Sequence, residues 1–169
     1  MALTKVIGSG LGAIPAISGA NLTGLTDSQM PAGSIIQVVE TRLTSQFSTT
    51  NGGYVETGLR LSITPTDNNN KIALLATFSL YISSAFLYCT IERNHSGISA
   101  TNLETSSGAG LCQLHAGGNE GDPSCISILD DPTTTNEITY NVQMKVQSGT
   151  GYLGINNCGS FFRAMEVVV

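Results

Sequence analysis

Apolar and polar residues alternate with a period of two along two long stretches of the chain, and this period is typical of β-strands. Between residues 71 and 93, the apolar positions are Ile72, Leu74, Ala76, Phe78, Leu80 and Ile82. Ser83 and Ser84 then interrupt the alternation before a second apolar run, so this stretch predicts two strands joined by a turn. Residues 136–148 carry the cleanest alternation in the protein, at Ile138, Tyr140, Val142, Met144 and Val146.

Shorter β-rich segments fill most of the remaining chain from residue 31 onward. They cover residues 34–42, 54–64, 124–129 and 161–169, and turn-forming sequences such as Asn51-Gly52-Gly53 separate them. Residues 94–123 are rich in glycine and predict a loop region. About eight strands without helices predict an all-β fold, a jelly-roll-like antiparallel β-sandwich, for a domain of residues 31–169.

One segment is long enough to cross a membrane. Residues 72–91 contain no charged side chain, and a transmembrane helix needs about 20 such residues. Their apolar residues alternate with polar ones instead of forming a continuous run, which favours strands over the alternative of a membrane helix. We therefore expect no membrane partner.

The charge of the protein argues against nucleic acid as a partner. Charged residues make up only 11% of the sequence, and the net charge is −5. The basic residues are scattered singly, whereas binding to a phosphate backbone needs clustered Lys and Arg. With so few charges, hydroxyl and amide groups must cover the surface.

The four cysteines are Cys89, Cys112, Cys125 and Cys158, and none forms a CxxC motif. Two disulfides in any of three pairings are compatible with this number. The first residues lack the basic and apolar runs of a secretion signal, which predicts synthesis in a reducing compartment. Free thiols are therefore favoured, with disulfides as the alternative.

The first thirty residues differ from the rest of the chain because glycines separate their apolar residues. So many glycines disfavour a helix, and so few apolar side chains cannot build a core of their own. Residues 1–30 therefore form either a disordered tail or an extended arm that is ordered by docking against another molecule, and we predict an attachment arm. Its contact residues would be Ile7, Leu11, Ile14, Ile17, Leu22 and Leu25.

No residue pattern points to catalysis, a metal site or a cofactor. His95 and His115 both fall in the expected loop region without further donors at a useful spacing. The nearby acids, Glu120, Asp122, Asp130 and Asp131, leave open a polysaccharide hydrolase, although Asp-Pro sequences are more typical of turns. The candidate external-loop contacts are His95, His115, Asn119 and Asp122.

Several motifs occur in a characteristic order after residue 30. They are Pro31-Ala32-Gly33-Ser34-Ile35-Ile36, Tyr54-Val55-Glu56-Thr57-Gly58-Leu59, Ser127-Ile128-Leu129-Asp130-Asp131-Pro132 and Met165-Glu166-Val167. In this order they resemble a virion-surface module that is widespread in marine tailed bacteriophages, where it is usually described as a tail-fibre or structural protein. The resemblance covers residues 31–169.

The resemblance implies a non-enzymatic virion component, assembled in the bacterial cytoplasm and displayed on the virion surface as a homotrimer. The short leading segment favours a capsid decoration or cement protein. Its partners would then be the major capsid protein or a tail or portal-proximal protein. The alternative is a short tail-fibre or receptor-binding protein that contacts glycan or protein on the host surface.

Overall fold

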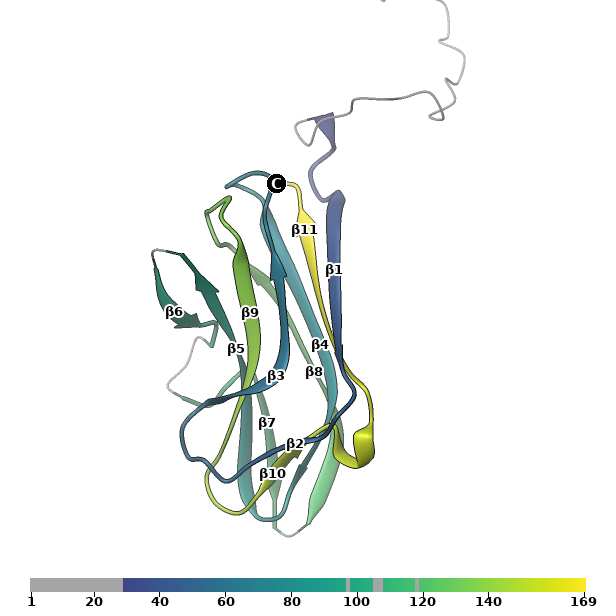
Figure 1. Ribbon diagram of the computed structural model, residues 1–169, viewed down its shortest axis with the longest axis vertical. Helices are drawn as coiled ribbons and strands as arrows, with labels where there is room; N and C mark the ends of the chain where they lie inside the picture. The colour runs from purple at the N-terminus through teal and green to yellow at the C-terminus, as the bar shows by residue number, and fades with distance from the viewer. Residues whose placement is uncertain (1–28, 97, 105–107, 118) are drawn as a thin grey trace, which may run out of the picture.

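The computed structural model describes residues 29–96, 98–104, 108–117 and 119–169, and the regular structure within them is almost entirely β-strand (Figure 1). A short 3-10 helix, η4 (Ile155–Asn157), lies near the C-terminus. The strands are β1 (Ile35–Leu43), β2 (Phe47–Thr49), β3 (Val55–Ile63), β4 (Lys71–Ile82), β5 (Ala85–His95), β6 (Ile98–Asn102), β7 (Cys112–Ala116), β8 (Glu120–Asp130), β9 (Ile138–Val146), β10 (Gly151–Leu153) and β11 (Ser160–Val167).

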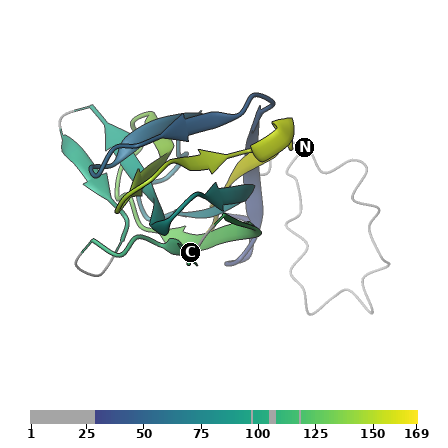
Figure 2. The same cartoon turned by 90° about the horizontal axis from the view of Figure 1, so that it is seen from below.

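The strands form two antiparallel sheets. The first sheet has β1, β11, β4 and β8 side by side. The short strand β10 pairs with the end of β4 that β11 does not reach, and β2 pairs with β10. The second sheet has β3, β9 and β5 side by side, and β5 pairs beyond this with both β6 and β7. Seen along the long axis, the strands enclose a common interior (Figure 2).

The strand order identifies the fold. When the short strands β2, β6 and β10 are set aside, the eight others can be numbered in chain order. The first sheet then contains strands one, eight, three and six, and the second contains two, seven, four and five. This order is that of a jelly roll, in which two Greek keys share one sandwich. The predicted all-β, jelly-roll-like sandwich is confirmed.

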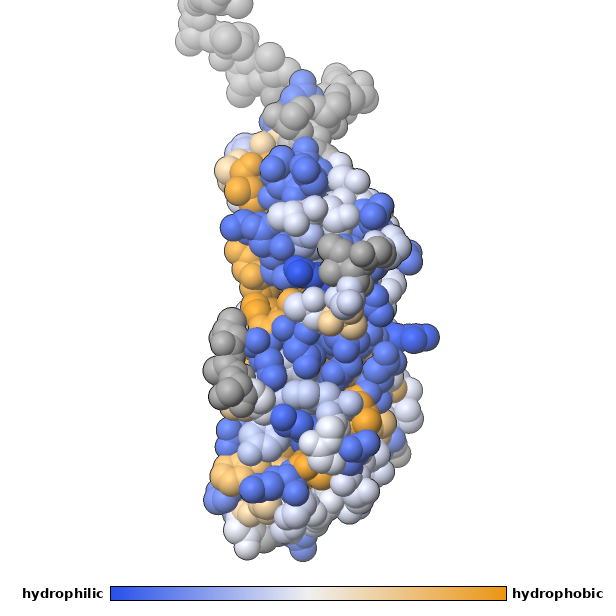
Figure 3. All heavy atoms as spheres, turned by 90° about the vertical axis from the view of Figure 1, so that its left-hand side faces the viewer, coloured by the Kyte–Doolittle hydropathy of each residue, from blue (hydrophilic) through white to orange (hydrophobic). Residues whose placement is uncertain are grey.

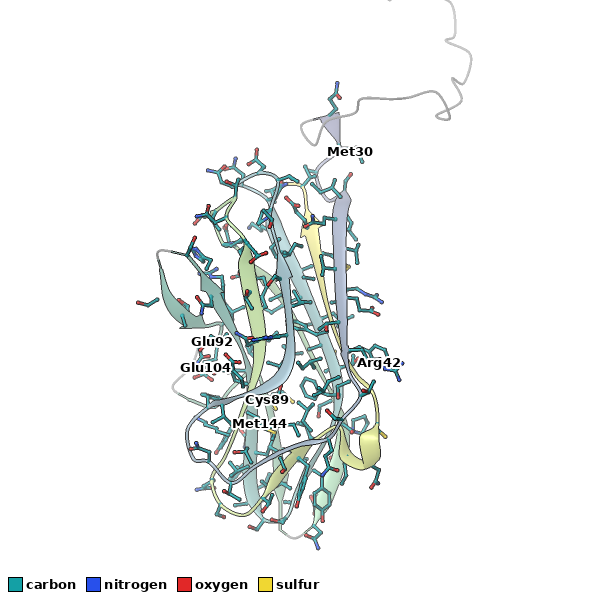
Figure 4. The ribbon with its side chains drawn as sticks, viewed as in Figure 1. Met30, Arg42, Cys89, Glu92, Glu104 and Met144 are labelled. Atoms are coloured by element: carbon teal, nitrogen blue, oxygen red, sulfur yellow. The ribbon has the colours of Figure 1, made fainter. Side chains whose placement is uncertain are left out.

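The core lies between the two sheets. Every second residue of β4, from Ile72 to Ile82, is buried, while the residues between them are half-buried or exposed. The inward residues of β9 meet them from the second sheet, including Tyr140 and Met144, which have no exposed surface. Figure 4 shows Cys89 and Met144 in this interior, where they are direct partners across β5 and β9. The alternation in the sequence therefore determines which side of each strand faces the core and which faces outward.

A buried polar cluster connects the two sheets. Asp130 on β8 accepts hydrogen bonds from Arg93 on β5 and from the Tyr140 hydroxyl on β9, and each bond is 2.7 Å long. Burial, followed by the nearby charge of Asp130, raises the pKa of Tyr140, so its hydroxyl keeps the proton that it donates. Because Asp130 belongs to the first sheet and its partners belong to the second, this cluster holds the sandwich together.

A second buried carboxylate holds the connection between β3 and β4. Glu166 on β11 has no exposed surface, and its Oε1 accepts hydrogen bonds from the backbone N–H and hydroxyl of Thr66 and from the Asn70 amide. These bonds fix the connection at the end of the sandwich where the C-terminus lies (Figure 1).

The predicted strands agree with the structure in most places. The pair expected across residues 71–93 is β4 and β5, with the turn at Ser83 and Ser84, and β9 falls within 136–148. The loop region expected at 94–123 is wrong, because β6, β7 and the start of β8 lie inside it. Pro123 is compatible with β8 because, among the described strands, β8 pairs with β4 alone, so one edge needs no hydrogen-bond donor.

Two further expectations concern the chain as a whole. None of the helices in the described part of the chain is long and apolar enough to span a membrane. All four cysteines are free thiols: Cys89 is buried, Cys112 is half-buried, and Cys125 and Cys158 are exposed. The boundary between arm and domain at residue 30 stays a prediction, because residues 1–28 lie outside the described residues.

Candidate functional site

The outer face of the first sheet carries neighbouring apolar side chains. The strand register places Val38, Met165, Ala73 and Leu129 in one row across β1, β11, β4 and β8. Val38 and Leu129 are 57% and 55% exposed, although they lie in regular strands. We call this surface the apolar face, and it consists of Ile35, Val38, Ala73, Leu75, Leu129, Phe161, Met165 and Val167.

Four charged side chains, Glu40, Arg42, Lys71 and Arg163, lie among the residues of the apolar face, and two of them form an ion pair. Arg163 donates a hydrogen bond of 2.9 Å to Glu40 in the neighbouring strand. The guanidinium of Arg42 lies over the Phe161 ring, 4.9 Å from its centroid. Gly159 makes this position possible, since a Cβ at that residue would lie 2.8 Å from the Arg42 guanidinium. Figure 4 shows Arg42 on the opposite side of the sandwich from Glu92 and Glu104.

An apolar groove continues this face toward the end of the sandwich that carries the β4–β5 turn. Its lining includes Phe161, Thr77 and Pro123 together with the two exposed thiols, Cys125 and Cys158. Cys125, Thr77 and Phe161 lie in one row across β8, β4 and β11. The groove therefore presents two accessible nucleophiles in an otherwise apolar setting.

The outer face of the second sheet is polar over the half near β6. Glu56, Arg60, Asn94, Glu137 and Asn141 line a shallow depression there. Figure 3 views the molecule from the side on which β6 lies, and most of that surface is hydrophilic. Residues of both charge signs and several amides occupy this half, so it offers hydrogen bonds to a partner but little apolar area.

Aromatic rings gather on the other half of the same face. The Phe86 ring lies 4.2 Å from His115 and 5.9 Å from Tyr88, measured between centroids. The Lys145 ammonium lies between two tyrosines, 5.2 Å from the ring of Tyr88 and 4.2 Å from that of Tyr54. We call Tyr54, Phe86, Tyr88, His115 and Lys145 the aromatic patch.

A hydrogen-bonded carboxylate fixes one edge of the aromatic patch. Glu104 Oε2 accepts bonds of 2.8 Å from the Tyr54 hydroxyl and from the backbone N–H of Gly110. Burial and the bond to Glu104 raise the pKa of Tyr54 above its usual value. Tyr54 therefore keeps the proton that it donates to Glu104 at pH values where an exposed tyrosine would ionise.

The structure separates the four candidate loop residues. His95 is not a loop residue but the last residue of β5; it is 7% exposed, and neither ring nitrogen has a hydrogen-bond partner among the described residues. His115 lies in β7 and is exposed, Asn119 is an exposed residue between β7 and β8, and Asp122 is an exposed residue of β8. His95 pairs with Ile138 and His115 with Phe86, so the histidines lie at opposite ends of β5. Their binding role stays a prediction.

Both outer faces contain residues that sequence reasoning missed. The sequence predicts Phe86, Tyr88 and Lys145 as strand residues without a surface role, and it predicts the same for Val38 and Leu129. A usable signal was present, since each of these large residues lies on the outward side of a strand with a buried alternate side. The six predicted contact residues of the arm, Ile7 to Leu25, lie outside the described residues.

Comparisons with known proteins give structural likenesses only. No protein-family model matches the sequence, and no curated protein matches it. The structure is similar to the VP2 subviral particle of infectious bursal disease virus, with a TM-score of 0.46, 14% identity, and coverage of 78% of this chain and 32% of that chain. This chain therefore spans about a third of the VP2 chain.

Two more distant likenesses have TM-scores below 0.35. The STIV MCP has a TM-score of 0.33 and 13% identity, with 78% of this chain and 48% of that chain covered. The Bacillus endospore appendages, which form disulfide-linked pili, have a TM-score of 0.31 and 12% identity, with 88% and 99% covered. The jelly-roll assignment rests on the strand order given above, and the function is argued from the surfaces of the molecule.

Proposed function

We propose that this chain is a non-enzymatic structural protein of a bacteriophage particle, attached to the capsid surface as an oligomer by its N-terminal arm. The observation that carries the proposal is the apolar face, where Val38 and Leu129 are more than half exposed on regular strands. Exposed contiguous apolar surface is typical of interaction sites. The order of motifs that resembles tailed-phage virion proteins supports the same role.

The energetics of the arm fit attachment to a repeating surface. Burial of six apolar side chains spread over residues 7–25 favours docking, whereas ordering the backbone between them opposes it, so a single copy gains little. Repetition on a symmetric shell multiplies a small gain per copy without any new type of contact.

Re-decoration of particles tests the proposal. Particles that lack the protein are mixed with the full-length chain or with an arm variant, Ile14→Asp combined with Ile17→Asp, and occupancy is measured by cryo-electron microscopy. Because a charged side chain opposes burial, we expect occupancy to fall at least tenfold. The matched control is Ser18→Asp, which adds a charge to the arm without removing an apolar residue. Full occupancy of the double variant contradicts the proposal.

A second candidate function has its own observation. The aromatic patch offers ring faces together with the Lys145 ammonium and the Glu104 carboxylate at its edge. Sugar rings have apolar C–H faces and peripheral hydroxyls, so stacked rings beside charged groups suit them chemically. This favours the alternative of a receptor-binding protein for host glycan, with His115 as a contact.

A glycan array separates the two candidates. A capsid cement protein is expected to bind no host glycan, whereas a receptor-binding protein is expected to bind at least one. The informative variant is Tyr88→Ala, because Tyr88 lies at the centre of the aromatic patch. Binding that is abolished in Tyr88→Ala and retained in Phe161→Ala, on the opposite sheet, supports the receptor role.

A further inference from the structure

The apolar face has no partner among the described residues. In the part of the chain that the structure describes, the exposed large hydrophobic residues are Ile35, Val38, Leu129, Phe161 and the C-terminal Val169, and the first four belong to this face. They lie on β1, β8 and β11, three strands whose inward sides are occupied by the core. A surface of this kind in contact with water is unfavourable, so a covering segment would stabilise the molecule.

The described chain begins beside this face and leads away from it. Gly33 donates a backbone hydrogen bond to Val168, Val168 donates one to Ser34, and Ser34 closes a turn with Pro31. The start of β1 is therefore tied to the end of β11. Figure 4 shows Met30 beyond the end of the sandwich rather than over either sheet.

The length and chemistry of the preceding segment match the apolar face. The 28 residues before Gln29 can reach about 90 Å when extended. Residues 6–26 contain no charged side chain, and small residues separate their apolar residues. An uncharged segment whose apolar residues are separated by small ones can lie against a sheet face on which Arg163 is paired with Glu40 and Arg42 covers the Phe161 ring.

We propose that the apolar face of one copy is the binding site for the arm, residues 7–25, of a neighbouring copy. This rests on the proposed function in that the arm is taken to be the attachment segment, and it narrows that function: the surface to which each arm attaches is the apolar face of a neighbouring copy rather than the capsid protein itself. The direction of the chain at Met30 favours a neighbour over the same copy. Such a head-to-tail contact produces a closed ring if the rotation closes, and this is compatible with the expected homotrimer.

A complementation experiment with the purified protein tests whether the arm binds the apolar face of a neighbouring copy. The face variant combines Val38→Glu with Leu129→Glu, and the arm variant combines Ile14→Asp with Ile17→Asp. We expect the wild-type protein to be oligomeric and each variant alone to be monomeric by sedimentation. An equimolar mixture should form dimers and nothing larger, because only the face variant's arm and the arm variant's face remain intact.

The matched control adds charges to the outer face of the second sheet. Ser62→Glu combined with Thr139→Glu changes two partners on β3 and β9 that are far from the apolar face, and this variant should remain oligomeric. Circular dichroism checks that all variants fold. The proposal is overturned if the wild type is monomeric, if the face variant still assembles, or if the mixture stays monomeric.

Cross-linking gives a second measurement that does not depend on loss of assembly. Ile17→Cys places a thiol in the arm, and Cys125 and Cys158 are exposed in the groove that continues the apolar face. A short bismaleimide joins two thiols because each thiolate adds across one maleimide double bond and the ring carbon takes up a proton. We expect covalent dimers, which disappear when Cys125 and Cys158 are both replaced by Ser. A link formed only within one chain overturns the proposal.

These measurements need no virus particle, so they separate the inference from the proposed function. If the purified chain assembles arm to face but does not decorate particles, the proposed function fails and the inference stands. If the arm variant fails to decorate particles while the mixture of variants stays monomeric, the inference fails and attachment by the arm stands.

Discussion

The two outer faces of the sandwich are built from the same kind of strand but differ in what they present. The first sheet presents aliphatic side chains such as Val38 and Leu129 in rows across its strands. The second presents polar groups over one half and a set of stacked rings over the other. A jelly roll needs only its inner faces to be apolar, so the outer faces are free to carry separate functions.

This difference suggests a division of roles. An aliphatic face has no directional groups and suits a partner that excludes water over a wide area. A patch of rings with an ammonium and a carboxylate fixes the orientation of a smaller, polar ligand. The first face is therefore suited to assembly and the second to recognition, and the following experiments test that comparison.

The largest expected difference is between the labelling rates of the thiols on the first sheet and in the core. Cys125 and Cys158 are exposed, and both line the groove of the first sheet, whereas Cys89 is buried in the interior. Burial also raises the pKa of Cys89 well above its usual value, which leaves little reactive thiolate. We expect Cys89 to react about a thousandfold more slowly with an aromatic disulfide reagent than either groove thiol. Reaction of all three at similar rates in native protein contradicts this.

Removing the buried link between the two sheets should have the next largest effect, a loss of stability, because both outer faces depend on the intact sandwich. Asp130→Ala leaves Arg93 and the Tyr140 hydroxyl without their shared acceptor. We expect the free energy of unfolding to fall by about 3 kcal/mol, measured by urea denaturation. Asp131→Ala is the control, since Asp131 is exposed and accepts from Arg93 through its backbone oxygen only. Equal stability of the two variants argues against a role for the buried polar cluster of Asp130 in holding the two sheets together.

A reciprocal pair of substitutions tests the division of roles directly. If the glycan array identifies a ligand, as the receptor-binding candidate requires, Phe86→Ala on the second sheet should weaken its binding about tenfold and leave assembly unchanged, because it removes one ring of the aromatic patch. Phe161→Ala on the first sheet should weaken assembly by a similar factor and leave glycan binding unchanged. Glycan binding and sedimentation are measured for both variants. If both substitutions affect the same property, the two faces do not act separately.

The smallest effect is expected at the edge of the aromatic patch. Glu104→Gln removes the charge that accepts from the Tyr54 hydroxyl and the Gly110 N–H, and should lower the free energy of unfolding by about 1 kcal/mol. The raised pKa of Tyr54 means that its stabilising contribution is complete below about pH 10, the usual tyrosine value, and declines as the pH rises above it. Urea denaturation between pH 8 and pH 11 measures both effects.

In that titration, Glu104→Gln should also bring the ultraviolet titration of Tyr54 to lower pH, while burial keeps part of the shift. Glu137→Gln, at an exposed carboxylate outside the patch, is the control. An unchanged tyrosine titration in Glu104→Gln would show that the bond to Glu104 has no part in holding the Tyr54 proton.

Most of the fold was predictable from the chain, and the exceptions have physical causes. The alternation in β4 and β9 is a local property, and both strands were expected. β7 and the start of β8 were missed because glycine, proline and polar residues surround them. They are held as strands by pairing with β5 and β4, partners that sequence reading does not identify.

The sequence by itself determined which side of each strand is apolar, because side chains alternate with a fixed period. Only the tertiary structure decided which strands are neighbours, and therefore which outward residues share a surface. Val38 and Leu129 are far apart in the chain, yet they lie in one row because β11 and β4 pair between their strands. Phe86 and His115 meet for the same reason. Strand pairing depends on the packing of the whole sandwich, which no local pattern encodes.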